Sequence, residues 1–258
     1  MTQQELAEMG SASVNIQLLD GTPCIRKSGA SPVERNFYQR AAPCLSGINT
    51  PALLKVDGET LFLEQIPHPV TLVQLHHNEQ TFAQLASLHN ANYQPDFALK
   101  AHGWSQADTE AALVMLCLPE AANEKIRHIQ QVGHALFEAP SLLSGDSNEG
   151  NWGTRNNGEL VLFDWERFGY GSPAIDLAPL VPQMGSLAEY ETIIERYLRH
   201  SSRLSGDRLL HHLIMAKCWL IIEVTNLLTR RGKPQAHRYL AWYRQQVPHW
   251  LESVAHRV

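Results

Sequence analysis

Three oxygen-bearing side chains stand close together in the segment from Ser144 to Asp176. Asp146 is followed shortly by Asn151, and Asp164 comes at the end of a short apolar run. A carboxylate can orient a hydroxyl and accept its proton, while a carboxamide and a second carboxylate supply the hard oxygen ligands that Mg²⁺ prefers. Phosphoryl transfer uses these parts, because it depends mostly on positioning and on neutralisation of charge. The residue types and their spacing therefore indicate a phosphoryl-transfer site.

A structural interpretation of the same residues is also open. Asp146 and Asn151 lie in a polar, glycine-flanked loop, and such loops are often turns whose side chains only cap main-chain groups. Asp164 favours the catalytic interpretation, because a carboxylate at the end of an apolar strand is costly unless it meets a cation. A structural salt bridge would satisfy that carboxylate as well.

The segment closely resembles the aminoglycoside phosphotransferase and choline kinase group, which has a protein-kinase-like fold. The matching residues, in chain order, are Gly145, Asp146, Asn151, Asp164, Trp165, Glu166, Gly171, Ser172, Pro173, Asp176, Leu177 and Ala178. The resemblance implies that Asp146 is the catalytic base, that Asn151 and Asp164 bind Mg²⁺, and that Asp176 braces the catalytic loop. The family usually has His before the Gly-Asp pair, where this chain has Ser144.

The resemblance extends to a nucleotide lysine and its partner near the N-terminus. Lys27 ends an expected strand, as the lysine that holds the α- and β-phosphates does in this family, and Arg26 is its rival. Glu34 stands where the helix glutamate that orients this lysine belongs. Without a nucleotide, Lys27 would be a solvated lysine, and Glu34 a first-turn glutamate that favours the helix dipole.

Two further segments resemble parts of the family's ATP site. The strand end from Leu61 to Ile66 is similar to the hinge whose main-chain groups bind adenine, which makes Glu64 and Ile66 candidate cofactor-binding residues. Met9 to Asn15 looks like the family's short phosphate-covering loop, although a Gly-Ser pair by itself is typical of ordinary turns.

Hairpins and helices can be predicted around these residues. Apolar alternation, Asp-Gly turns and a Ser-Pro helix start predict strands over 14–18, 23–27, 52–56 and 60–64, with a helix opening at Ser31. Short buried strands are expected at 142–143 and 160–163. Helical periodicity predicts helices over 72–90, 121–138, 186–200, 205–231 and 234–254. In the helix over 205–231, one apolar stripe is expected, made of Leu209, Leu213, Ala216, Leu220, Val224 and Leu227.

The resemblance implies an α+β, bilobal, protein-kinase-like fold, and the expected order of strands and helices agrees with it. A change in composition near residue 66 separates a small β-rich N-terminal nucleotide-binding lobe, 1–66, from a larger α-helical catalytic and substrate lobe, 67–258. A chain of 258 residues is long enough for two such lobes around a cleft.

The net charge and the cysteines indicate which binding partners and which cellular compartment to expect. The formal net charge of −5 argues against nucleic-acid binding, which favours basic surfaces. Four scattered cysteines without a CxxC pair indicate reduced thiols in a cytoplasmic protein. The N-terminus has no basic and apolar leader, the longest apolar runs are too short to span a bilayer, and the 13 histidines show no zinc-ligand spacing.

The leading hypothesis is an ATP- and Mg²⁺-dependent kinase that phosphorylates a hydroxyl of a small molecule such as an amino alcohol, amino sugar or vitamin. The alternative, motivated by Ser144, is a weak or inactive kinase-like nucleotide- or metabolite-binding protein; a metal-dependent hydrolase is a third possibility. Glu223, Asn226 and Trp219 could line the acceptor pocket or belong to a solvated helix face. The sequence does not indicate the oligomeric state.

Overall fold

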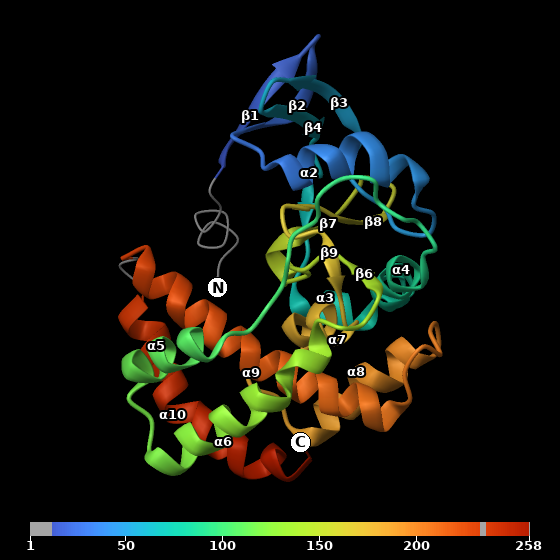
Figure 1. Cartoon of the computed structure of the whole chain (residues 1–258). Coiled ribbons are helices and arrows are strands. Elements are labelled where there is room, and N and C mark those ends of the chain that lie inside the picture. Colours follow the sequence, from blue (N-terminus) through green and yellow to red (C-terminus); the bar gives the residue numbers. More distant parts are fainter. Residues whose placement is uncertain (1–11, 233–235, 258) are drawn as a thin grey trace. The chain divides into compact units, whose positions relative to one another are not determined.

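The computed structural model describes residues 12–232 and 236–257, so residues 9–11 of the expected phosphate-covering loop lie outside the described residues. The chain forms two compact units (Figure 1). The first comprises the chain up to Ala101 together with Ser141–Tyr170, and the second comprises His102–Pro140 and Gly171–Val258. The lobe boundary expected near residue 66 falls inside the first unit, and the division into lobes at that point stays a prediction.

A four-stranded antiparallel sheet opens the first unit, with strand order β1-β2-β4-β3. The strands are β1 (Ser13–Leu19), β2 (Thr22–Ser28), β3 (Leu53–Asp57) and β4 (Thr60–Glu64). Asp20 and Gly21 join the first pair with φ angles of 51° and 82°, the left-handed conformations that a tight two-residue hairpin turn requires. The first predicted hairpin is thus confirmed. The second is also present, since β3 pairs with β4 antiparallel, but its turn is formed by residues 58 and 59, and Asp57 is the last residue of β3.

Helix α2 (Pro32–Asn36) carries Glu34 into the interior of the first unit. The Ser31 side chain accepts a hydrogen bond from the Glu34 N–H, and Pro32 occupies the first turn, as the Ser-Pro start predicts. A π-helical turn, Phe37–Ala41, follows directly and presents Phe37 to the core. Its ring stacks on Trp165 with a centroid separation of 3.9 Å and an interplanar angle of 8°.

The rest of the first unit contains short strands around two helices. The single helix expected over 72–90 is wrong, because the chain breaks at Asn78 into α3 (Leu72–His77) and α4 (Glu79–Asn90). The Asn78 side chain caps α4 by accepting from the Gln80 N–H. The short strands are β5 (His68–Pro69), β6 (Ser141–Leu143), β7 (Trp152–Thr154), β8 (Leu160–Leu162) and β9 (Gly169–Gly171), of which β5, β7 and β8 form one sheet and β6 and β9 another.

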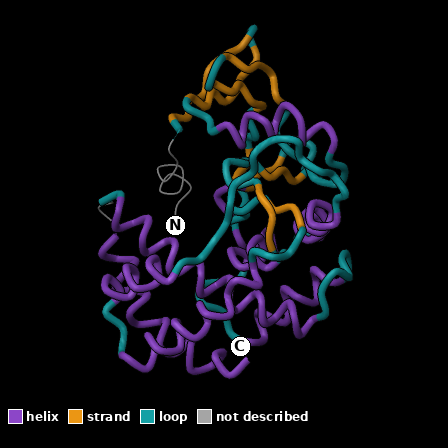
Figure 2. Tube along the Cα trace, in the orientation of Figure 1, coloured by secondary structure: helices purple, strands orange, loops and turns teal. Residues whose placement is uncertain are grey.

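The second unit is built from helices, which Figure 2 shows in purple. They are α5 (Gln106–Leu116), α6 (Glu120–Val132), α7 (Ala174–Leu177), α8 (Leu187–Leu198), α9 (Gly206–Arg230) and α10 (Ala236–Val254). The predicted helices that became α8 and α9 are confirmed, and so is the one that became α10 from Ala236 onward; residues 234 and 235 of that prediction lie outside the described residues. The one expected over 121–138 ends early, at Val132, where the chain continues as a 3-10 turn from Gly133.

Helix α9 is buried on more sides than a single apolar stripe allows. Leu220, Val224 and Leu227 of the expected stripe are only half-buried, while the polar Lys217 and Asn226 are buried. By length and composition α9 could cross a membrane, contrary to the expectation from uninterrupted apolar runs, yet 67% of its apolar window is buried inside the fold. A core helix packed on most of its faces explains both observations.

Buried polar groups of α9 hold the segment after Gly171. His212 Nδ1 lies 2.8 Å from Ser172 Oγ, and the Lys217 amine donates to the carbonyl oxygens of Ala178 and Val181 at 3.2 and 2.9 Å. Burial lowers the pKa of Lys217 to about 7, and burial with the nearby Arg208 and His211 lowers the pKa of His212 to about 4. His212 is therefore neutral in the folded protein near pH 7.

We expect the neutral state of His212 to make the fold sensitive to acid. Between the unperturbed pKa of 6.5 and the folded value of about 4, the unfolded chain binds more protons. The free energy of unfolding should therefore decrease as the pH falls through this interval. Urea unfolding at pH values from about 7 to about 4 measures it, and His212→Gln should make the decrease shallower. An equal slope in the variant would contradict this account.

Candidate active site

Lys27 links two carboxylates that come from distant parts of the sequence. Its amine lies 2.8 Å from a Glu34 carboxylate oxygen and 2.8 Å from Asp164 Oδ1, across sequence separations of 7 and 137 residues. Lys27 is 7% exposed and Glu34 is fully buried, whereas the Asp164 side chain is 33% exposed. Arg26, the rival of Lys27, precedes it in β2, and successive strand residues point to opposite faces of a sheet. The structure therefore brings Lys27 to Glu34.

The electrostatics of this triad favour a charged lysine. Burial by itself lowers the pKa of Lys27, but the charges and hydrogen bonds of Asp164 and Glu34 outweigh burial and raise it. Burial raises the pKa of Glu34, and the positive charge of Lys27 partly opposes that rise. The ammonium group is thus retained in the interior by its two acidic neighbours.

Asp164 has an unusual backbone conformation beside this lysine. Its φ of 64° is left-handed, a conformation that Asp and Asn tolerate better than most residues with a side chain. The buried Tyr38 hydroxyl is close by. Burial raises its pKa, the Glu34 and Asp164 carboxylates raise it further, and the Asp164 main chain opposes them as a hydrogen-bonding group.

The loop between β6 and β7 presents Asp146 and Asn151. The Asp146 carboxylate accepts a 2.6 Å hydrogen bond from Asn148 Nδ2, and its carbonyl oxygen accepts a 2.7 Å bond from Asn151 Nδ2. Because the Asn151 nitrogen donates to Asp146, the Asn151 Oδ1 is the amide atom suited to a cation. Ser144, where the family has His, is buried, and its hydroxyl accepts from the Asp146 N–H at 3.3 Å.

Neighbouring side chains anchor the ends of this loop. The Glu149 carboxylate accepts a 2.6 Å bond from the Leu72 N–H at the start of α3, and the indole of Trp152 donates to the Ser147 carbonyl at 3.0 Å. The Arg167 guanidinium donates to the Gly145 carbonyl at 2.9 Å. The loop is thus held from α3, from β7 and from the turn after Asp164.

Acidic charge accumulates around Asp164. Burial raises the pKa of Glu166, and the charges of Asp164 and Asp146 raise it while Lys27 opposes them. Glu166 belongs to the Asp-Trp-Glu run, and no role was predicted for it from the sequence. The run of two acids around one Trp was the available signal. The electrostatic interaction of these carboxylates favours a cation nearby, and the Lys27 ammonium is already in that position beside Asp164.

The proposed hinge residues are tied to the strands beside the loop. The Glu64 carboxylate binds the Arg155 guanidinium through two contacts of 2.7 Å, and the Glu64 N–H donates to the Ala52 carbonyl at 2.9 Å. The Ile66 side chain lies against Gly153 so closely that a Cβ there would sit 2.8 Å from Ile66 Cγ2. Glu64 is therefore held by the residues just before β3 and just after β7, and Ile66 lies against β7 itself.

Other candidates have structural partners in the second unit. Asn226 donates to the Asp108 carbonyl at 2.9 Å, and the Trp219 indole donates to the Gly103 carbonyl at 3.1 Å. Both side chains are buried, so the solvated helix face considered for them is wrong. Asp176 is fully buried in α7, and its role as a brace stays a prediction.

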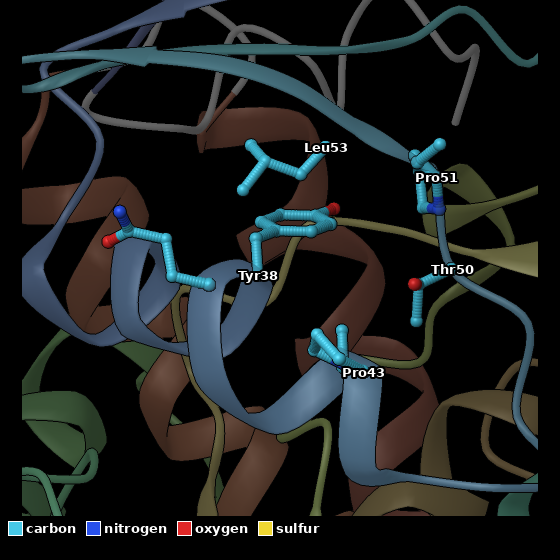
Figure 3. A pocket seen from close by; sticks show the side chains of 8 residues that line it. Tyr38, Pro43, Thr50, Pro51 and Leu53 are labelled. Carbon is cyan, nitrogen blue, oxygen red and sulfur yellow. The ribbon is translucent and has the colours of Figure 1, made fainter.

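The walls of a pocket in the first unit contain none of the predicted site residues, although Ala52, which lines it, is hydrogen-bonded to Glu64. Its volume is about 540 Å³, and Figure 3 shows Tyr38 and Pro43 from the turns after α2 facing Thr50, Pro51 and Leu53 from the chain that enters β3. None of the residues predicted to bind nucleotide or metal lines this pocket. Its position therefore gives no support to a role in the chemistry.

Known proteins are similar to most of the chain. The sequence model described as APH, the phosphotransferase enzyme family, matches residues 26–209. This range includes every residue predicted to act as the catalytic base, to bind the nucleotide through a side chain or the hinge, or to bind Mg²⁺. No curated protein matches the chain in sequence.

Solved structures show the fold. A choline/ethanolamine kinase family protein from Mesorhizobium loti is 15% identical, covers 96% of this chain and 91% of its own, and superposes with a TM-score of 0.66. The enzyme in a gentamicin–APH(2")-IIa complex is 15% identical, with coverage of 98% and 96% and a TM-score of 0.61. LicA in complex with AMP is 14% identical, with coverage of 97% and 96% and a TM-score of 0.60. The predicted α+β, kinase-like fold is thereby confirmed.

Proposed function

Because this chain belongs to the phosphotransferase enzyme family, we propose that it transfers the γ-phosphoryl group of ATP to a hydroxyl of a small molecule. The observation that carries the proposal is the meeting of Lys27 with Glu34 and Asp164, two residues far from each other in sequence. A buried lysine held between two carboxylates is suited to gripping phosphate as a point charge.

An apolar surface beside Lys27 supports binding of the adenine base. Val14 lies opposite Lys27, and Ile16 lies opposite Ile25, in the register of β1 and β2, so these four side chains share one face. Val14 and Ile16 are 50% and 65% exposed. A flat base would cover such a surface, and main-chain groups from Glu64 to Ile66 would bind its edge.

The side chains present also fit Mg²⁺. Asn151 and Asp164 would hold the ion, because amide and carboxylate oxygens are the ligands that it prefers. Over residues 12–232 and 236–257, no three His, Cys, Asp or Glu side chains form a metal group by themselves, so phosphate oxygens would complete the coordination. Bound Mg²⁺ would offset the charge that the phosphate oxygens carry.

The side chains of this site have separate tasks in the proposed transfer. Lys27 holds the phosphates while Glu34 keeps its ammonium group oriented. Asp146 accepts a hydrogen bond from the acceptor hydroxyl. As the bond between the acceptor oxygen and the γ-phosphorus forms, the bond from that phosphorus to the ADP oxygen breaks, and the hydroxyl proton passes to the Asp146 carboxylate.

The acceptor we propose is an amino alcohol, an amino sugar or a vitamin-like alcohol. The structural neighbours include a choline/ethanolamine kinase family protein and a gentamicin complex, which supports a cationic small molecule bearing a hydroxyl. The AMP bound to LicA supports an adenine nucleotide as donor. We propose a cytoplasmic location, since a pool of ATP is required.

Measuring ATP consumption with an acceptor panel tests the proposal. A thermal-shift screen with Mg²⁺ and ATP, ADP or GTP first identifies nucleotides that stabilise the folded protein. Amino alcohols, amino sugars, vitamins and sugars are then assayed, with the Asp146→Asn variant as the blank. Acceptor-stimulated ATP consumption above that blank is expected.

The same experiment separates the alternatives. Nucleotide binding with no turnover on any acceptor would favour a kinase-like binding protein, the possibility that Ser144 raises. Absence of binding by any nucleotide at millimolar concentration would refute the nucleotide-dependent function while leaving the fold intact.

A further inference from the structure

Asn148 makes two side-chain hydrogen bonds inside the loop that carries Asp146. Its Nδ2 donates to Asp146 Oδ1 at 2.6 Å, and its Oδ1 accepts from the Gly150 N–H at 2.8 Å. The second bond makes Asn148 the cap of the 3-10 turn Glu149–Asn151. One amide side chain therefore contacts the carboxylate of Asp146 and begins the turn that ends at Asn151.

Asn151, at the end of the turn, hydrogen-bonds back to Asp146. Its Nδ2 donates to the Asp146 carbonyl oxygen at 2.7 Å, so the main chain of Asp146 is attached to the end of the turn that Asn148 caps. Ser144 Oγ accepts the Asp146 N–H from the other side. Asp146 is thus held at its amide, its carbonyl and its carboxylate by three different side chains.

The short bond from Asn148 suits a carboxylate that must stay oriented. Hydrogen bonds to ionised groups are shorter and stronger than those between neutral groups. An amide N–H is too weakly acidic to give up its proton near pH 7, so it can fix one carboxylate oxygen without competing for the proton of a substrate. Asn148 is half-buried, which keeps water from replacing it freely.

We propose that Asn148 is a positioning residue that sets the orientation of the Asp146 carboxylate and, through the turn it caps, the place of Asn151. The inference rests on the proposed function, in which Asp146 receives the hydroxyl proton and Asn151 is a metal ligand. It also explains how the loop keeps its order with Ser144 at the position where the family usually has His.

Asn148→Asp separates the two bonds of this side chain. Aspartate has the same size and caps a helical turn as well as asparagine does, so the Gly150 contact is kept. The donor to Asp146 is lost and two carboxylates face each other. We expect kcat to fall about tenfold or more, the scale of a hydrogen bond to a charged group, with KM for ATP changed by less than about twofold. Asn148→Ser also caps the turn but does not add a second carboxylate, so its kcat should fall less than that of Asn148→Asp.

Asn78→Asp is the matched control, because Asn78 caps α4 by the same contact, at 3.0 Å from the Gln80 N–H. It should leave kcat unchanged. A kcat in Asn148→Asp equal to that of the control, or a loss of kcat matched by an equal loss of ATP affinity, would overturn the positioning role.

A crystal structure of Asn148→Asp gives a readout that does not need turnover. The Asp146 carboxylate should turn away from position 148 while the 149–151 turn is retained. If the wild-type protein phosphorylates no acceptor, the proposed function fails, and this structure still decides the role of Asn148. An Asp146 side chain in its original orientation would overturn it.

Discussion

Replacing Asp146 by asparagine is expected to lower turnover at least about a hundredfold, the usual scale for a general acid–base group, while leaving nucleotide affinity nearly unchanged. The variant keeps the size and polarity of the side chain but removes the carboxylate that accepts the hydroxyl proton. Lys27, Glu34 and Asp164, which we assign to nucleotide and metal, contact one another without the participation of this carboxylate. Steady-state kinetics and titration calorimetry with Mg²⁺-ATP measure the two effects separately.

Asp57→Asn is a suitable control for that experiment. Asp57 is exposed at the end of β3, directly before the Gly58–Glu59 turn, and an exposed substitution of this kind changes the stability of the fold very little. The control should match the wild-type protein in both measurements. If Asp146→Asn kept its turnover at saturating substrate and lost only ATP affinity, the assignment of Asp146 as the base would be wrong.

Lys27→Met should abolish nucleotide binding and also destabilise the fold. Methionine fills similar volume but leaves the fully buried Glu34 without the ammonium group. Breaking a buried ion pair by removing one partner costs about 3–5 kcal/mol. The pKa of Glu34, already raised by burial, should rise further, so the destabilisation should be smaller at acidic pH, where Glu34 binds a proton, and should grow as the pH increases.

A second substitution separates the effect of Lys27 on the stability of the fold from its effect on nucleotide binding. Lys27→Met combined with Glu34→Gln removes the unpaired carboxylate and should recover most of the lost unfolding free energy, measured by urea titration. Nucleotide binding should stay absent, because the phosphate-holding charge is still missing. Recovery of ATP binding in the double variant would show that Lys27 serves only to neutralise Glu34.

Local features of the sequence predicted the elements that carry the site. Asp20-Gly21 marked the first hairpin, and the Ser31-Pro32 start placed Glu34 in the first turn of α2, because these turn and cap chemistries act within a few residues. The break at Asn78 was missed for a related reason. A capping Asn within an apolar periodicity competes with continuation of the helix, and periodicity alone does not register it.

The parts that depend on tertiary packing could not be predicted in the same way. The contact of Lys27 with Asp164 spans 137 residues, and no local pattern encodes it. The resemblance implied the residues, but not that Asn148 would hold the Asp146 carboxylate. Likewise, the burial of Asn226 in α9 follows from its hydrogen bond to Asp108, a partner on another helix that amphipathicity does not reveal.

The stack of Phe37 on Trp165 gives the protein an internal optical reporter. Trp165 directly follows Asp164, and its ring lies parallel to that of Phe37, just beyond the helix that bears Glu34. Indole emission depends on the groups packed around the ring, so a displacement of Asp164 or of this helix should alter the emission of Trp165. The chain has six tryptophans, and the difference between the wild-type spectrum and that of Trp165→Phe isolates this one. Movements of Asp164 or of the helix that bears Glu34 can therefore be followed by fluorescence without attaching a label.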